Sequence, residues 1–278
     1  KTFEFLKEQK EPVILHIITE KGHGYQPALD KPDKFHGLGK YKIETGETDP
    51  ASVPTYSQIY GEFLTKFAKE DEKITAITAA MPGGTGLATF RDNEEVNDRY
   101  FDVGIAEEHA ALFASGLATQ GLKPFLTIYS TFMQRAFDML VHDIGIQNLP
   151  VRLCMDRAGL SGDDGPTHHG LFDIGYLRHV PNFVFMQPKD EDEFVDMLWT
   201  MANHDSGPIA VRYPRGSGTG AKPKNKPEEL EIGKAEVVQI GNDIGLIGLG
   251  HLFSMAEQTC TSLEELGHSV ELINPRFI

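Results

Sequence analysis

Residues 124–156, PFLTIYSTFMQRAFDMLVHDIGIQNLPVRLCMD, contain the unit that decides the fold. Two apolar runs, Pro124–Tyr129 and Val151–Met155, flank the segment Thr131–Ile144, for which we predict a helix. Neither run alternates with polar residues in the way a half-exposed strand does, and this is typical of strands buried on both faces of a parallel sheet. A strand, a crossover helix and a second strand of this kind predict an α/β fold.

The same alternation of strands and helices continues on both sides of this unit. Apolar spacing predicts helices at Tyr56–Glu70, Ala106–Thr119 and Asp190–Asn203. Apolar runs predict strands at Pro12–Ile18, Ile74–Ala79, Tyr100–Val103 and Pro208–Arg212. We therefore predict a mostly parallel sheet that is flanked by helices on both faces.

Two segments without apolar periodicity divide the chain. Thr19–Pro54 is rich in Gly, Pro, Lys and Asp, which indicates a linker or a functional loop. Gly216–Pro227, GSGTGAKPKNKP, has the composition of a linker. After it, strands at Ala235–Ile240, Ile244–Gly250 and Ser269–Ile273, with a helix near Ser254–Leu266, predict the start of a second α/β unit.

The composition excludes several classes of protein. With 278 residues and 26 Lys and Arg against 41 Asp and Glu, the chain has a formal net charge of −15, which disfavours nucleic acid and anionic membranes as partners. Only two cysteines occur, so a disulfide framework and a cysteine-based zinc site are excluded. No apolar run approaches the ~20 residues of a membrane span. The chain opens on Lys1, and we expect it to be a piece of a longer, soluble protein from a reducing compartment.

Polar and glycine-rich segments follow four of the predicted strands, at the edge where α/β sheets bind ligands. They are Gly104–His109, Ser130–Arg135, Asp156–Gly170 and Tyr213–Gly216. Each segment also has a simpler interpretation. An acid such as Glu107 is favoured in the first turn of any helix, and the two arginines, Arg157 and Arg215, could be ordinary ion-pair partners. The His168-His169 pair with its nearby acids is more typical of a solvated turn than of a metal site. Met81–Gly86 lacks the lysine of a P-loop.

Taken together, the segments resemble one family. FDVGIAEEHA (101–110), YSTFMQRAFD (129–138), DRAGLSGDDGPTHHG (156–170), VRYPRG (211–216) and KGHGYQPA…FHG (21–37) are similar to the 1-deoxy-D-xylulose-5-phosphate synthases, which are transketolase-like enzymes. The resemblance implies a homodimer that uses thiamine diphosphate and Mg²⁺. It would condense pyruvate with D-glyceraldehyde 3-phosphate to 1-deoxy-D-xylulose 5-phosphate and CO₂, for the non-mevalonate route to isoprenoids and for thiamine and pyridoxal synthesis.

The resemblance also implies a domain division and a location. Residues 1–54 would end a diphosphate-binding domain, 55–215 would form the pyrimidine-binding domain, 216–234 a linker, and 235–278 part of the C-terminal domain. The Gly-Asp-Gly…Asn motif that holds Mg²⁺ and the diphosphate is expected upstream of Lys1, so no metal ligand is assigned here. We expect this piece alone neither to bind the cofactor tightly nor to turn over. A bacterial cytoplasmic location is implied, and a plastid is not excluded.

The resemblance assigns roles to individual residues. Glu107 matches the carboxyl group that acts at N1′ of the cofactor pyrimidine, and His36 and His168 are the candidates for proton transfer at substrate oxygens. Ile105, Phe132 and Met81 would contact the cofactor. The residues that would bind the phosphorylated acceptor are Tyr129, Arg135, Arg157, Asp164 and Arg215. The family commonly has Gln where Glu108 and His169 stand, and neither difference removes a catalytic group.

Two alternatives remain open from the sequence. One is a transketolase or a pyruvate dehydrogenase E1 β subunit, of which the latter lacks the diphosphate motif; the product formed would separate these enzymes. The other is a non-catalytic module of the pyrimidine-binding fold that binds a phosphorylated sugar or serves in assembly. A Glu107→Ala variant in the full-length protein would separate that module from an enzyme.

Overall fold

The computed structural model describes residues 1–32, 34–36, 39–48 and 53–278, and it divides the chain into two compact units. The first unit, Lys1–Ala51, contains α1 (Thr2–Glu8), α2 (Gln26–Asp30) and the short 3₁₀ helix η1 (Lys34–His36). The prediction of a strand at Pro12–Ile18 is wrong, because these residues have no regular structure and Ile14 is 95% exposed. β-Branched composition favours a strand only where a neighbouring strand pairs with it, and the described residues of this unit contain none.

The second unit, Ser52–Ile278, is built on a parallel sheet of six strands in the order β2-β1-β3-β4-β6-β5. The strands are β1 (Ile74–Thr78), β2 (Tyr100–Asp102), β3 (Lys123–Tyr129), β4 (Arg152–Asp156), β5 (Val184–Met186) and β6 (Ile209–Arg212). Tyr129 pairs in register with Asp156, and Met155 pairs with Arg212. The carboxyl ends of the three central strands therefore meet at one edge, and the predicted α/β fold is confirmed.

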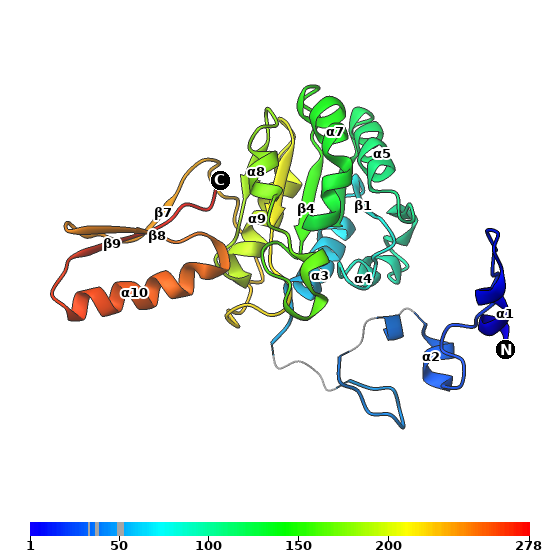
Figure 1. The fold of residues 1–278 in the computed structure, drawn as a ribbon. Coiled ribbons are helices and arrows are strands. Elements are labelled where there is room, and N and C mark those ends of the chain that lie inside the picture. Colours follow the sequence, from blue (N-terminus) through cyan, green and yellow to red (C-terminus); the bar gives the residue numbers. More distant parts are fainter. Residues whose placement is uncertain (33, 37–38, 49–52) are drawn as a thin grey trace. The chain divides into compact units, whose positions relative to one another are not determined.

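Helices cover both faces of this sheet (Figure 1). One face packs against α3 (Tyr56–Glu70) and α9 (Glu191–Asn203), and the other packs against α5 (Glu107–Thr119) and residues 130–145. Phe125 lies in the apolar cluster on the face covered by α3 and α9, whereas Leu126 and Ile128 lie in the cluster on the face covered by α5. This period of two explains why β3 is apolar at nearly every position.

The segment predicted as one helix at Thr131–Ile144 is helical throughout but changes its geometry. It contains α6 (Ser130–Met133), η3 (Gln134–Ala136), α7 (Phe137–Met139) and η4 (Leu140–Gly145), and η4 is a π-helix. The shorter helices elsewhere are α4 (Ala88–Arg91), η2 (Asn97–Arg99), η5 (Gly162–Asp164), η6 (Pro166–His168) and α8 (Asp173–Leu177). The sequence analysis did not predict α8 or the three-residue strand β5.

The C-terminal region forms the predicted second α/β arrangement. Its three strands, in the order β7-β9-β8, pack against α10 (Phe253–Glu265), which follows η7 (Gly250–Leu252) (Figure 1). The strands are β7 (Glu236–Gln239), β8 (Ile244–Ile247) and β9 (Val270–Asn274). We refer to residues 236–274 as the C-terminal sheet unit.

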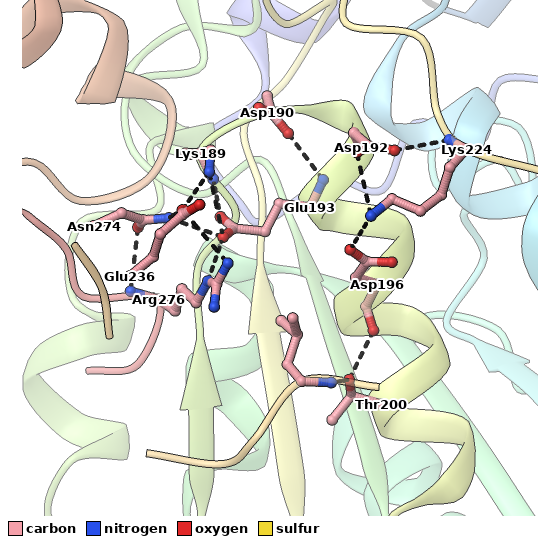
Figure 2. Close-up of polar contacts among 11 residues, drawn as sticks. Lys189, Asp190, Asp192, Glu193, Asp196, Thr200, Lys224, Glu236, Asn274 and Arg276 are labelled. Atoms are coloured by element: carbon pink, nitrogen blue, oxygen red, sulfur yellow. Dashed lines mark hydrogen bonds and ion pairs between the residues drawn. The ribbon is translucent and has the colours of Figure 1, made fainter. Parts of the chain in front are cut away.

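Figure 2 shows that α9 binds both the C-terminal sheet unit and the segment that leads to it. Glu193 accepts hydrogen bonds from Asn274 Nδ2 at 2.8 Å and Arg276 Nε at 2.7 Å, and Glu236 pairs with Lys189 beside it. We call these five residues the α9 latch.

Farther along the same helix, Asp192 accepts from the backbone N–H of Lys224 at 2.7 Å, and Thr200 Oγ1 accepts from that of Leu230 at 2.9 Å (Figure 2). Asp196 binds the Lys224 ammonium at 2.8 Å. The glycine- and lysine-rich composition of residues 216–227 indicates a linker, yet its backbone is bound along this helix.

Candidate active site

Glu107 is the first residue of α5 and its carboxylate is buried, at 2% exposure, whereas the adjacent Glu108 is exposed. The turn before it is shaped by Asp102, whose Oδ1 accepts from Ala80 N at 2.8 Å and Gly104 N at 3.0 Å. Gly104 has φ +71°, which glycine adopts without strain. The helix dipole favours a carboxylate at this end of a helix, which suits an acid in the first turn.

Arg135 of η3 contacts Glu107. Its Nη1 lies 3.1 Å from Glu107 Oε2, and its side chain is 56% exposed. Among the described residues, nothing hydrogen-bonds the second carboxylate oxygen, Oε1. A buried carboxylate with one oxygen available can exchange a proton with a bound heterocycle. The predicted role of Arg135 at the acceptor phosphate stays a prediction, because its observed partner is Glu107.

The three residues predicted to contact a cofactor differ in burial. Ile105 is 77% exposed, so core packing, the simpler interpretation, does not account for it. Phe132 and Met81 are half-buried against the apolar cluster under α5. The ring of Phe132 stacks on Tyr129 with centroids 5.6 Å apart and meets the His168 ring edge-on at 5.3 Å. An exposed aliphatic side chain and a half-buried aromatic face are suited to hold a flat ring.

Tyr129 and Arg157, at the ends of neighbouring strands, form one contact. The guanidinium carbon of Arg157 lies 3.9 Å from the centre of the Tyr129 ring. Burial raises the pKa of the Tyr129 phenol to about 12, so the hydroxyl is a hydrogen-bond donor at neutral pH. Arg157 Nη1 donates to Gly84 O at 2.5 Å and lies 3.1 Å from Asp156 Oδ1.

Asp164 joins the two arginines predicted to bind a phosphate. Its Oδ2 lies 3.4 Å from Arg157 Nε and 2.9 Å from Arg215 Nε. Within the described chain, neither Arg157 Nη2 nor the terminal nitrogens of Arg215 have an acceptor. One carboxylate thus orients two guanidinium groups by their inner nitrogens and leaves outer N–H groups for an anion. We call Arg157, Asp164 and Arg215 the arginine pair with its bridging acid.

The two histidines of the 159–170 loop differ in their contacts. His169 Nδ1 accepts a hydrogen bond from Ser161 N at 3.0 Å, so it supports the loop. His168 instead packs against Phe132 and Tyr129, and its Nδ1 contacts Thr167 Oγ1 at 3.0 Å. The structure therefore brings His168 to the predicted site and leaves His169 as a structural residue.

His36 lies in the first unit, Lys1–Ala51, and is exposed. Its Nδ1 is 3.3 Å from Lys21 Nζ, and because an ammonium can only donate, Nδ1 is the acceptor. Gly37, the last residue of the FHG motif, lies outside the described residues.

Two residues of the site were missed by the sequence analysis. Asp156 is fully buried and accepts from Ser57 Oγ at 2.6 Å and from Arg157 N at 2.7 Å. Burial raises its pKa, and the Arg157 guanidinium opposes that shift. Gly84 is the other: the Met81–Gly86 loop, rejected as a phosphate-binding motif, supports Arg157 and Tyr129. An acid at the end of a buried strand was the available signal for Asp156, but no sequence pattern marked Gly84.

We expect Gly84→Ala to destabilise the protein by about 1–3 kcal/mol and to displace Tyr129. A Cβ atom at Gly84 would lie 1.8 Å from the Tyr129 hydroxyl oxygen, so the ring must move. Urea unfolding of the full-length protein would measure the loss. Gly83→Ala is the matched control, because a Cβ atom there meets nothing within 4 Å. Equal stability of the two variants would contradict the close contact.

The described residues contain no group of three or more His, Cys, Asp or Glu side chains that could hold a metal ion. No helix among them has the length and apolar character needed to cross a membrane. Cys154 is buried in β4 and lies away from the polar edge.

The curated relatives extend the resemblance over the whole chain. A protein named 1-deoxy-D-xylulose-5-phosphate synthase from Acidobacterium capsulatum is 58% identical over 277 residues, covering 100% of this chain and 44% of that protein. One of the same name from Methylacidiphilum infernorum is 56% identical with the same coverage. The chain therefore spans less than half the length of these relatives.

Solved structures show the same fold. A chain described as a split-gene transketolase, inactive beta4 tetramer, matches with TM-score 0.71 and 24% identity, covering 82% of this chain and 73% of that chain. A Pichia stipitis transketolase in complex with sedoheptulose 7-phosphate matches with TM-score 0.66 and 16% identity, over 83% of this chain and 36% of the other. At such identities the likeness shows the fold alone.

The transketolase pyrimidine-binding domain family matches residues 52–219, which contain the residues of the site described above; the candidate His36 lies outside the match. The match covers the six-stranded sheet, its helices and the loops at its polar edge. Together with relatives that are 58% and 56% identical over the whole chain, it confirms the resemblance seen in the motifs. The chain belongs to the transketolase pyrimidine-binding domain family and is similar throughout to 1-deoxy-D-xylulose-5-phosphate synthases.

Proposed function

We propose that this chain forms part of a 1-deoxy-D-xylulose-5-phosphate synthase, which condenses pyruvate with D-glyceraldehyde 3-phosphate and releases CO₂. The observation that carries the proposal is the identity of 58% to a relative of that name over the whole chain. The chemistry of the site supports the proposal. A buried carboxylate, an aromatic face and two arginines with N–H groups available for an anion lie at one edge of the sheet. The product would enter isoprenoid synthesis.

The residues present fit the pyrimidine half of thiamine diphosphate. Glu107 offers a buried carboxylate oxygen without a protein partner among the described residues, and Phe132 and Ile105 offer apolar surface for a ring. When bound, thiamine diphosphate supplies the nucleophilic carbon of the reaction. Mg²⁺ and the diphosphate would be held by a domain upstream of Lys1.

Glu107 would share a proton with N1′ of the pyrimidine ring, which is the role that its burial and its free oxygen permit. Arg135, whose Nη1 lies 3.1 Å from this carboxylate, would also contact the acceptor substrate from its exposed side. His168 would hold or release a proton at a substrate oxygen, and we propose the same role for His36. Met81 would complete the apolar wall.

The acceptor phosphate would bind between Arg157 and Arg215. Guanidinium groups pair with phosphate oxygens by two parallel hydrogen bonds, and both arginines have outer nitrogens without an acceptor in the described chain. Tyr129 would donate its phenolic hydrogen to the same substrate, since its pKa of about 12 keeps it protonated. Asp164 would hydrogen-bond the acceptor hydroxyl or aldehyde region while it orients the arginines.

We further propose the domain division and the assembly implied by the family. Residues 1–54 end a diphosphate-binding domain, 55–215 form the pyrimidine-binding domain, 216–234 a linker, and 235–278 begin a C-terminal domain. Two copies of the full-length chain form a homodimer in the bacterial cytoplasm. With a net charge of −15, nucleic acid and anionic membranes are unfavourable partners.

The test is to purify the full-length protein and assay it with thiamine diphosphate, Mg²⁺, pyruvate and D-glyceraldehyde 3-phosphate. We expect 1-deoxy-D-xylulose 5-phosphate and CO₂ in equal amounts. Acetyl transfer to lipoamide would identify a pyruvate dehydrogenase E1 component, and ketol transfer between sugar phosphates would identify a transketolase. Binding of a sugar phosphate without any turnover would identify a non-catalytic module. Each of these three outcomes would overturn the proposal.

A further inference from the structure

Arg212 and Asp173 form a buried ion pair that the proposed mechanism does not use. Arg212 ends β6 and Asp173 begins α8; their side chains are 7% and 0% exposed. Arg212 Nε donates to Asp173 Oδ2 at 2.8 Å, and Nη2 donates to Oδ1 at 3.1 Å. This two-point geometry fixes the plane of the guanidinium group.

From this position Arg212 holds the base of the 159–170 loop. Its Nη2 also donates to the Gly170 carbonyl at 3.3 Å. Gly170 and Gly159 exchange two backbone hydrogen bonds of 2.8 Å each, so they close the loop. Gly170 is confined further, since a Cβ atom there would lie 2.4 Å from Ser130 Oγ. We call Gly159 and Gly170 the loop base, and the loop above it carries Asp164 and His168.

The same guanidinium reaches the C-terminal part of the chain through Gln187. Arg212 Nη1 donates to Gln187 Oε1 at 2.6 Å, and Gln187 N donates to Arg276 O at 2.9 Å. Gln187 also packs tightly on Gly250 of η7, where a Cβ atom would lie 2.0 Å from its Nε2. The neighbouring His251 lies against Gly159, with its ring carbon 3.8 Å from the place of a Cβ atom.

We propose that Arg212, Asp173 and Gln187 are positioning residues. Through them, the C-terminal sheet unit fixes the position of the 159–170 loop, which would contact the substrate. The chain of contacts runs from η7 and Arg276 through Gln187 and Arg212 to the loop base. It thereby places Asp164, which orients Arg157 and Arg215, and His168, which packs on Phe132. The inference rests on the proposed function for its substrate and deepens it.

The chemistry of the Arg212–Asp173 ion pair suits a role in positioning the loop better than a role in stabilising the fold. Removing two charges from water costs much of what their attraction returns, so buried ion pairs contribute little net stability. Apolar residues of similar volume would pack the same space, but they would not bind both the Gly170 carbonyl and the Gln187 amide. A planar donor with five N–H groups can hold these partners at once.

A contact on α9 provides the matched control, because it lies outside the chain of contacts that runs from Arg276 to the loop base. Thr200 Oγ1 accepts a hydrogen bond from the backbone N–H of Leu230 at 2.9 Å. Thr200→Val keeps the size of the side chain and removes this acceptor without changing Arg212 or Gln187. Gln187→Met keeps the size of the side chain but removes the acceptor of Arg212 Nη1.

We test the inference on the full-length protein by two measurements. In Gln187→Met, we expect hydrogen exchange of the backbone amides in 159–170 to rise about tenfold, as for the loss of a hydrogen bond to a charged group. We expect KM for D-glyceraldehyde 3-phosphate to rise by a similar factor with kcat little changed, and KM for unphosphorylated D-glyceraldehyde to stay the same. Thr200→Val should change none of these values.

A double variant, Arg212→Met with Asp173→Leu, removes the pair without leaving one charge buried, and so preserves folding. It should show the same exchange and KM changes. Unchanged exchange in Gln187→Met, or equal changes in Thr200→Val, would overturn the inference. Hydrogen exchange needs no substrate, so a protein that forms no deoxyxylulose phosphate would refute the proposed function and still allow this test.

Discussion

Replacing Glu107 by glutamine in the full-length protein is expected to lower kcat about 10³-fold, because the variant loses the carboxyl group that we propose exchanges a proton with N1′. Glutamine has the same size and can still accept a hydrogen bond, so the buried site at the start of α5 remains filled. It cannot take up or release the proton at neutral pH. Steady-state formation of 1-deoxy-D-xylulose 5-phosphate measures the change, and Glu107→Ala should lose at least as much.

Glu108→Gln is the matched control for this prediction. Both acids stand in the first turn of α5 and interact with the same helix dipole, but Glu108 is exposed and Glu107 is 2% exposed. The control variant should keep kcat within about twofold of the unmodified enzyme, since exposed first-turn charges contribute ~0.3–1 kcal/mol to the helix. Full activity in Glu107→Gln or Glu107→Ala would show that Glu107 does not exchange a proton with N1′.

Replacing Arg157 or Arg215 by methionine is expected to raise KM for D-glyceraldehyde 3-phosphate about 10²-fold. Each guanidinium can donate two hydrogen bonds to the phosphate, and each such bond to a charged group contributes about 1.5–3 kcal/mol. The effect should nearly vanish with unphosphorylated D-glyceraldehyde as the acceptor, because the lost contacts are to the phosphate.

Arg178→Met, at an exposed arginine after α8, controls for the general loss of a positive charge and should leave KM unchanged. Arg157 also stacks on Tyr129 and binds Gly84, so its variant should lose stability in urea as well, whereas Arg215→Met should not. A rise in KM that is the same for phosphorylated and unphosphorylated acceptors would show that the arginines do not bind the phosphate.

The sheet could be predicted from the sequence because its strands are apolar on both faces. Five of the six parallel strands were predicted within a few residues, as were α3, α5 and α9. β5 was missed because three residues carry too little pattern to separate a strand from a loop. Pro12–Ile18 was wrongly predicted for the opposite reason: its composition is that of a strand, but pairing depends on a partner elsewhere.

The sequence could place candidate residues at the polar edge of the sheet, because motifs mark the strand ends. It could not show which of these residues contact one another over long distances in the chain. Helix pattern alone could not separate Glu107 from Glu108 as the buried acid, since both suit a first turn, and only the family resemblance pointed to Glu107. The sequence also did not show that Asp164 bridges Arg157 and Arg215, which are far from one another along the chain. Gly84 has its role because it faces Tyr129, and that contact depends on the register of the sheet.

By itself, the sequence determined the parallel α/β fold, the polar edge and the family, because hydrophobic periodicity and strand-end motifs are local properties of the chain. Only the tertiary structure decided which carboxylate is buried, which arginines share an acid, and that Arg212 and Gln187 lie between the C-terminal sheet unit and the 159–170 loop. The physical reason is that burial and ion pairing depend on distances between segments, which strand order and register set and local sequence does not encode.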